Sequence, residues 1–140
     1  MTLKMDGAAL AAFTTAEFPQ AGDGYRIDAL SMDGITVSMD VDDSHIRPGG
    51  TVSGPTMFAL VDVTMYLLVL SRIGPQALAV TTNCSIDFMR KPGLSTLSAK
   101  ARVLKLGRSL CVGEVHLYSN GTADPVARAN LTYALPQSGP

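Results

Sequence analysis

The hydrophobic pattern is dominated by one apolar stretch, GPTMFALVDVTMYLLVLS, which runs from Gly54 to Ser71 and contains a single charged residue, Asp62. Pro55 suits the first turn of a helix, where its missing N–H costs nothing, and Ser53 or Gly54 would cap that turn. Gly74-Pro75 would end the helix. Because this helix is apolar nearly all round, we expect the rest of the protein to enclose it.

Alternating apolar and polar positions predict strands on both sides of this helix. Tyr25–Met32 and Ile35–Val41 are joined by Asp33-Gly34, a strong signal for a tight hairpin. The predicted strands after the helix are Ala77–Arg90, Thr96–Leu106, Leu110–Tyr118 and Pro125–Leu135. In the first of these, the alternation predicts one face with Leu78, Val80, Thr82, Cys84, Ile86 and Phe88, and an outer face with Thr81, Asn83, Ser85 and Asp87. Residues 3–14 have a weak helical pattern, and Asp42 to Ser53 forms a polar loop.

This order of elements predicts an α+β fold. A single buried helix and one antiparallel sheet of five or six strands can satisfy each other if the sheet curls around the helix. The 140 residues suffice for one domain, which we expect to comprise an N-terminal helical segment (1–22) and a core (25–136).

Composition narrows the class of protein further. The net charge of −1 argues against a nucleic-acid surface, and the charged fraction of 16% suggests that partner subunits cover some of the surface. Cys84 and Cys111 suggest reduced thiols in a cytoplasmic protein. The 54–71 stretch is about as long as a membrane span, but a central Asp costs about 3 kcal/mol on insertion scales, so we expect no membrane partner.

Three segments together resemble the PaaI-like acyl-CoA thioesterases of the hotdog fold. RPGGTVSGPTMFALVDVTM is similar to the loop, His-Gly-Gly, helix and Leu-Ala-Asp of that family, with Leu60-Val61-Asp62 at the position of the acidic triplet. VTTNCSIDFMRKPG resembles its long strand, and LKLGRSLCVGEVHLY resembles its Gly-Arg strand pair. The similarity covers residues 35–135 and implies an acyl-CoA thioesterase that hydrolyses its substrate without metal or cofactor.

Thioester hydrolysis needs a carboxylate that activates water or attacks the carbonyl, and a donor for the oxyanion. Asp62 fits the first role, although a buried Asp can also simply bond a neighbour's hydroxyl or a subunit interface. The Gly54 N–H fits the second role, although Gly54-Pro55 also serves simply to start a helix. The resemblance implies that Thr81 holds the attacking water, although an ordinary strand threonine fits the pattern as well. Arg47 stands where many members have an amide side chain; it could bind the thioester carbonyl, pair with Asp62 or be solvated.

Other residues are candidates for substrate binding. Phe58 and Tyr66 share the helix face of Asp62 and could line an acyl pocket or pack in the core. The charged turns at Arg90-Lys91 and Gly107-Arg108 could hold the phosphates of coenzyme A, as the resemblance suggests, or be solvated. Ser53, at the position of the family's His, and Asn83 are the remaining candidates near the site.

The spacing of Gly54 and Asp62 raises a geometric question. Eight residues correspond to about 12 Å along one helix, so one carbonyl cannot reach both groups. Either one of them takes no part, or the site combines two subunits; the resemblance implies a homodimer, or a tetramer built from it. Ser53 replaces the family's His and Pro55 its second glycine, so a non-catalytic protein that binds acyl-CoA or an acyl carrier is the alternative.

Overall fold

Helix α2 (Gly54–Ile73) lies at the centre of the computed structural model, which describes residues 2–21 and 24–137. Ser53 caps the helix, and its side chain accepts a hydrogen bond from the Thr56 N–H at 3.2 Å. The helix ends at Gly74, where φ is 94° and the amide donates to the Leu70 carbonyl at 2.8 Å. The predicted helix is confirmed, and it continues two residues beyond the apolar stretch that ends at Ser71.

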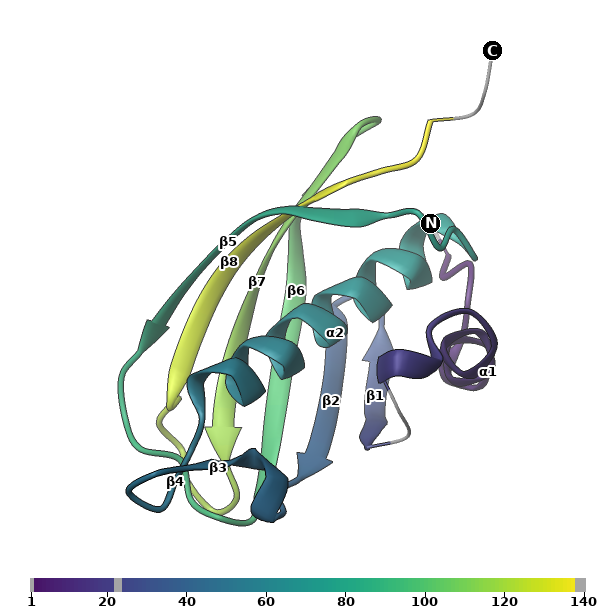
Figure 1. Ribbon diagram of the computed structural model, residues 1–140. Coiled ribbons are helices and arrows are strands. Elements are labelled where there is room, and N and C mark those ends of the chain that lie inside the picture. The colour runs from purple at the N-terminus through teal and green to yellow at the C-terminus, as the bar shows by residue number, and fades with distance from the viewer. Residues whose placement is uncertain (1, 22–23, 138–140) are drawn as a thin grey trace.

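A six-stranded antiparallel sheet curls around this helix (Figure 1). Its order is β1-β2-β6-β7-β8-β5, so β1 and β5 are the edge strands. The strands are β1 (Tyr25–Ser31), β2 (Gly34–Asp40), β5 (Val80–Phe88), β6 (Thr96–Leu106), β7 (Leu110–Ser119) and β8 (Ala127–Ala134). The sheet and the enclosed helix confirm the α+β prediction.

Two further segments flank this core. Helix α1 (Gly7–Glu17) begins after Asp6, whose side chain accepts from the Ala9 N–H, and it lies beside β1; it starts and ends later than the weak pattern over 3–14 predicts. The 3₁₀ turn η1 (Pro19–Ala21) follows it. The polar 42–53 segment is more ordered than a loop, because it contains the 3₁₀ turn η2 (Asp43–His45) and a ribbon of β3 (Ile46–Arg47) and β4 (Thr51–Val52).

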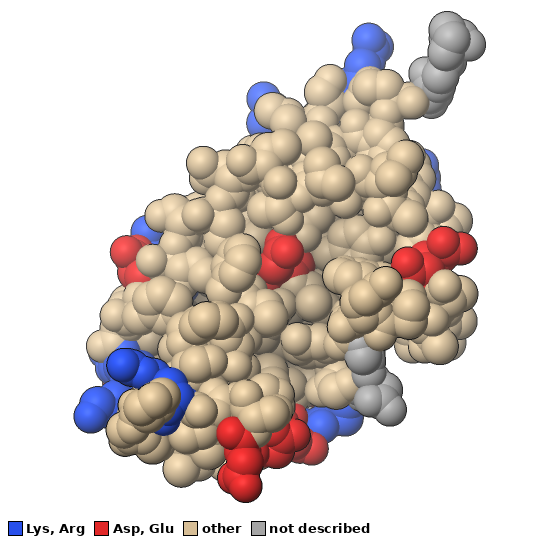
Figure 2. All heavy atoms as spheres, in the orientation of Figure 1, with Lys and Arg blue, Asp and Glu red and all other residues tan. Residues whose placement is uncertain are grey.

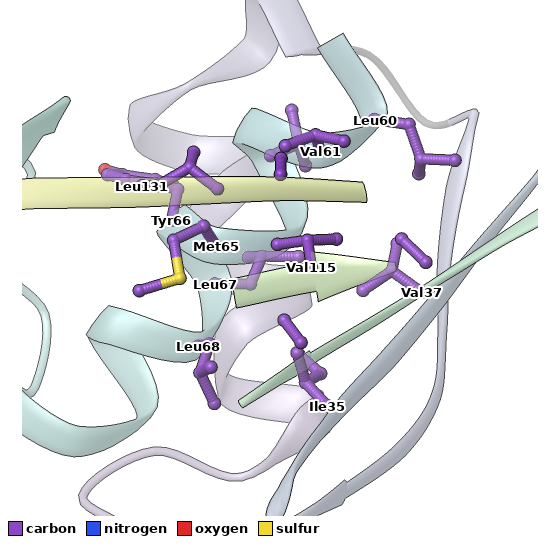
Figure 3. Close-up of a cluster of buried hydrophobic side chains, with 14 of the residues drawn as sticks. Ile35, Val37, Leu60, Val61, Met65, Tyr66, Leu67, Leu68, Val115 and Leu131 are labelled. Carbon is purple, nitrogen blue, oxygen red and sulfur yellow. The ribbon is translucent and has the colours of Figure 1, made fainter. Parts of the chain in front are cut away.

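The core lies between the concave face of the sheet and α2 (Figure 3). Leu60, Val61 and Leu68 of the helix are fully buried against side chains such as Val37 and Val115. By length and composition α2 could span a membrane, but 67% of its most apolar window is buried inside the domain. It is therefore the core helix that the sequence predicts.

Edge strand β5 contains a β-bulge that changes which side chains face the helix. Thr81 pairs with Tyr133 and Asn83 pairs with Thr132, so Thr82 is an extra residue on the bulged strand. An extra residue shifts the alternation by one position. Thr81 consequently faces α2, and its placement on the outer face with Asn83 was wrong; Val80, predicted to point inward, is 53% exposed.

Candidate active site

The Asp62 carboxylate is held by two neutral hydroxyl groups. Its Oδ1 accepts hydrogen bonds from Thr81 Oγ1 at 2.6 Å and from the Tyr133 hydroxyl at 2.7 Å. Among residues 2–21 and 24–137, no Lys, Arg or His forms an ion pair with Asp62. Asp62 is also the only acidic residue of α2. Hydroxyl donors, and no cation of the described residues, therefore hold the Asp62 carboxylate.

Asp40 at the end of β2 shows a different arrangement. Arg26 donates to both of its oxygens, at 2.9 and 3.4 Å, and Thr96 donates to Oδ1 at 3.0 Å. The hydrogen bonds from Arg26 and Thr96, together with the charge of Arg26, lower the pKa of Asp40. Both carboxylate oxygens of Asp40 thus accept hydrogen bonds from neighbouring side chains. In Asp62, by contrast, no donor in the described part of the chain reaches Oδ2, and that oxygen is available for chemistry.

Asp62 opens into a cavity of about 670 Å³, which we call the aromatic cleft. The rings of Phe18 and Tyr66 meet edge to face with centroids 5.8 Å apart, and Tyr66 and Tyr133 are 6.3 Å apart. The residues that line the aromatic cleft include Phe18, Phe58, Asp62, Tyr66, Thr81 and Tyr133. Four residues expected at the site from sequence (Phe58, Asp62, Tyr66 and Thr81) are therefore brought together.

Tyr133 is the main residue that sequence reasoning missed. It lies in β8, is 2% exposed, and reaches Asp62 across the cleft. Burial, and next the negative charge of Asp62, raise the pKa of its hydroxyl, which therefore stays protonated and can donate. The sequence carried one signal for Tyr133, because the hydroxyl of a buried tyrosine generally needs a hydrogen-bond partner. The sequence does not say which partner.

A second depression of about 440 Å³ lies at the N-terminal end of α2, and we call it the cationic groove. It is lined by Gly54, Arg47, Arg90 and Lys91, with Phe88 and others, and has no lining residue in common with the aromatic cleft. Lys and Arg side chains gather near β3 and β4 in Figure 2. The option that Arg47 pairs with Asp62 is wrong within one chain, since Arg47 lies in this groove.

The other predicted residues lie elsewhere. Ser53 is engaged in the helix cap, with its hydroxyl 2.8 Å from Thr56 Oγ1. Asn83 is exposed on the outer face of β5. Gly107 and Arg108 border a third pocket of about 240 Å³ beside Lys4 and Arg72, at the opposite end of α2 from Gly54. One chain therefore does not assemble all the expected residues around Asp62.

A curled sheet around a central helix, with an acidic residue in that helix, defines a hotdog thioesterase fold. The family model described as "Thioesterase superfamily" matches residues 49–126, and the chain belongs to this family. A candidate esterase from Pseudomonas aeruginosa is 31% identical over 104 residues, which are 73% of this chain and 75% of the relative. The family and the fold expected from the sequence motifs are thus confirmed.

Solved structures agree with this assignment. A candidate thioesterase from Silicibacter sp. TM1040 has a TM-score of 0.89 and 51% identity, covering 97% of this chain and 95% of that one. A candidate thioesterase from Streptococcus pneumoniae, solved with coenzyme A, has a TM-score of 0.78 and 25% identity, covering 94% of this chain and 100% of that one. The phenylacetic acid degradation protein PaaI of Thermus thermophilus, as an N33D mutant, has a TM-score of 0.71 and 25% identity, covering 89% and 99%.

Proposed function

We propose that this protein hydrolyses acyl-CoA thioesters to a free acid and coenzyme A. The observation that carries the proposal is the Asp62 carboxylate in the aromatic cleft, which has uncharged partners and an Oδ2 that no donor among the described residues reaches. An aromatic cleft suits an acyl chain, while the separate cationic groove suits the phosphates of coenzyme A. The coenzyme A bound to the Streptococcus relative supports this class of substrate.

Asp62 can act in either of two ways. As a general base, it takes a proton from water while the resulting hydroxide attacks the acyl carbon; the C–S bond then breaks and the thiolate takes up the proton. As a nucleophile, Oδ2 attacks the acyl carbon and expels the thiolate, and water then cleaves the resulting anhydride. Both routes use the chain's own groups and need no metal or cofactor.

The oxyanion donor in this proposal is the Gly54 N–H of a second subunit. Within one chain, Gly54 and Asp62 are about 12 Å apart along α2, too far to share one carbonyl. Edge strand β5 supports a homodimer, because it is nine residues long and exposes Val80 and Phe88, each 53% accessible. An unpaired apolar edge of this kind favours pairing with another chain.

The test measures free thiol released from short, medium, long and aryl acyl-CoAs by wild type and by Asp62→Asn. We expect turnover to fall by about a hundredfold or more in Asp62→Asn, because the amide can neither accept the proton nor attack. Asp40→Asn makes the same chemical change at a carboxylate outside the cleft and should leave turnover at the wild-type level.

Other outcomes would redirect the assignment. Acyl-CoA binding without turnover by the wild type would establish the non-catalytic binding protein, for which Ser53 and Arg47 mark lost chemistry. Equal turnover by wild type and Asp62→Asn would remove Asp62 from the mechanism. A cytoplasmic location stays a prediction.

A further inference from the structure

The hydrogen bonds to Asp62 are asymmetric, since both reach Oδ1. We propose that Tyr133 is a positioning residue which, together with Thr81, fixes Oδ1 and so makes Oδ2 the oxygen that meets water or the acyl carbon. This inference rests on the proposed thioesterase function. It also assigns Thr81 to orienting the carboxylate, where the resemblance implied that it holds the water.

The geometry shows why Tyr133 serves the carboxylate. Its hydroxyl lies 2.7 Å from Oδ1 and 3.1 Å from the Asp62 carbonyl oxygen. A phenol has one proton, and in a helix that carbonyl already accepts from the amide four residues later. The shorter contact to a charged oxygen is the stronger one.

The donors also come from a rigid support. Tyr133 is anchored in β8 between β7 and β5, and its ring packs against Tyr66. Thr81 is opposite Tyr133 in the sheet register, and the bulge turns it toward α2. Two adjacent strands thus hold one oxygen of a helical side chain, which leaves the carboxylate little freedom to rotate.

The experiment compares Tyr133→Phe, Thr81→Val and Thr81→Ser. We expect Tyr133→Phe and Thr81→Val each to lower kcat by about ten- to a hundredfold, with KM within about twofold, since each loses a hydrogen bond to a charged group. Thr81→Ser keeps the hydroxyl and should restore most of kcat. Tyr118→Phe removes a hydroxyl on the outer face of β7 and is the matched control.

A double-mutant cycle separates positioning from other roles. If Tyr133 acts through the carboxylate, Tyr133→Phe should have little further effect in the Asp62→Asn background. Thermal melting of each variant identifies any loss of fold, and Thr81→Val tests the same oxygen if Tyr133→Phe does not fold. The crystal structure of Tyr133→Phe should show an Asp62 carboxylate rotated from its wild-type orientation.

Two results would overturn the inference: a kcat for folded Tyr133→Phe within twofold of wild type, or a rise in KM alone, which would make Tyr133 a wall of the acyl cleft. Failure of the proposed function looks different, because wild type and Asp62→Asn would then have equal turnover. In that case the crystal structure still decides whether Tyr133 orients the carboxylate, and an unmoved Asp62 counts against it.

Discussion

The aromatic cleft and the cationic groove both border α2, yet they are chemically opposite. The cleft has the Asp62 carboxylate held by hydroxyl groups among aromatic rings, whereas the groove has Arg47, Arg90 and Lys91 around the start of the helix. In the proposed function, the cleft takes the acyl group and the groove takes the phosphates of coenzyme A. Within one chain Asp62 and Gly54 are about 12 Å apart along α2, so the proposed mechanism combines Asp62 of one chain with Gly54 of another.

The largest expected effect comes from an experiment that tests whether Asp62 of one chain and Gly54 of another form one site. Asp62→Asn and Gly54→Pro, which removes the amide, should each be nearly inactive. When the two are mixed so that subunits exchange, half of the dimers combine them and each mixed dimer has one intact site of two, so about one quarter of wild-type activity should return. Thiol release from the mixture, at known subunit composition, measures this.

The control for this mixture is Gly54→Ala, which keeps the amide. Its Cβ would lie 3.7 Å from Phe88 Cζ, an ordinary contact, so it separates loss of the N–H from added bulk. A mixture as inactive as its parents, although subunit exchange is demonstrated, would mean that Asp62 and Gly54 do not complete each other across two chains.

The central helix, strand β6 and the importance of Asp62 could be predicted from the sequence, because the strongest signals in the sequence are local. The helix over 54–73 follows from one apolar run, and β6 was predicted with the bounds that it has, Thr96–Leu106. Asp62 stands out because a charge in an apolar helix is expensive unless something offsets its burial. Signals of this kind depend on neighbours in the chain.

Long-range features could not be predicted in the same way. The orientation of Thr81 depends on a bulge that exists only when β5 pairs with β8, and strict alternation gave the wrong face. Tyr133 is 71 positions from Asp62, and from sequence its ring fits any buried strand position. The division of Arg47 and Asp62 between two depressions likewise depends on tertiary packing.

An intermediate effect should distinguish the roles of the two surfaces. Lys91→Gln in the cationic groove should raise KM for acyl-CoA by about tenfold with kcat unchanged, since a charge-assisted contact to phosphate is lost. KM for the matching N-acetylcysteamine thioester, which has no phosphate, should not change. Steady-state kinetics on both substrates at fixed ionic strength measure the difference.

Lys100→Gln is the matched control for this prediction, because Lys100 is exposed on β6 with its Nζ over the outward Tyr118 ring. It should leave both KM values at the wild-type level. An equal rise of KM for both thioesters in Lys91→Gln would show that the groove does not recognise the phosphates.

The smallest effect concerns the acyl group and the mouth of the aromatic cleft. Phe58 is 42% exposed, unusually open for a phenylalanine in a core helix, and an acyl chain in the cleft would cover it. Covering about half of such a side chain is worth about 1 kcal/mol, so Phe58→Ala should raise KM about fivefold for medium-chain and aryl acyl-CoAs. Acetyl-CoA is too short to gain that contact, and its KM should change little. Leu104→Ala removes a similarly exposed apolar side chain from β6 and should change neither KM. A uniform rise across all chain lengths would place Phe58 at the thioester itself, and the division between a cleft that recognises the acyl group and a groove that recognises coenzyme A would then have to be redrawn.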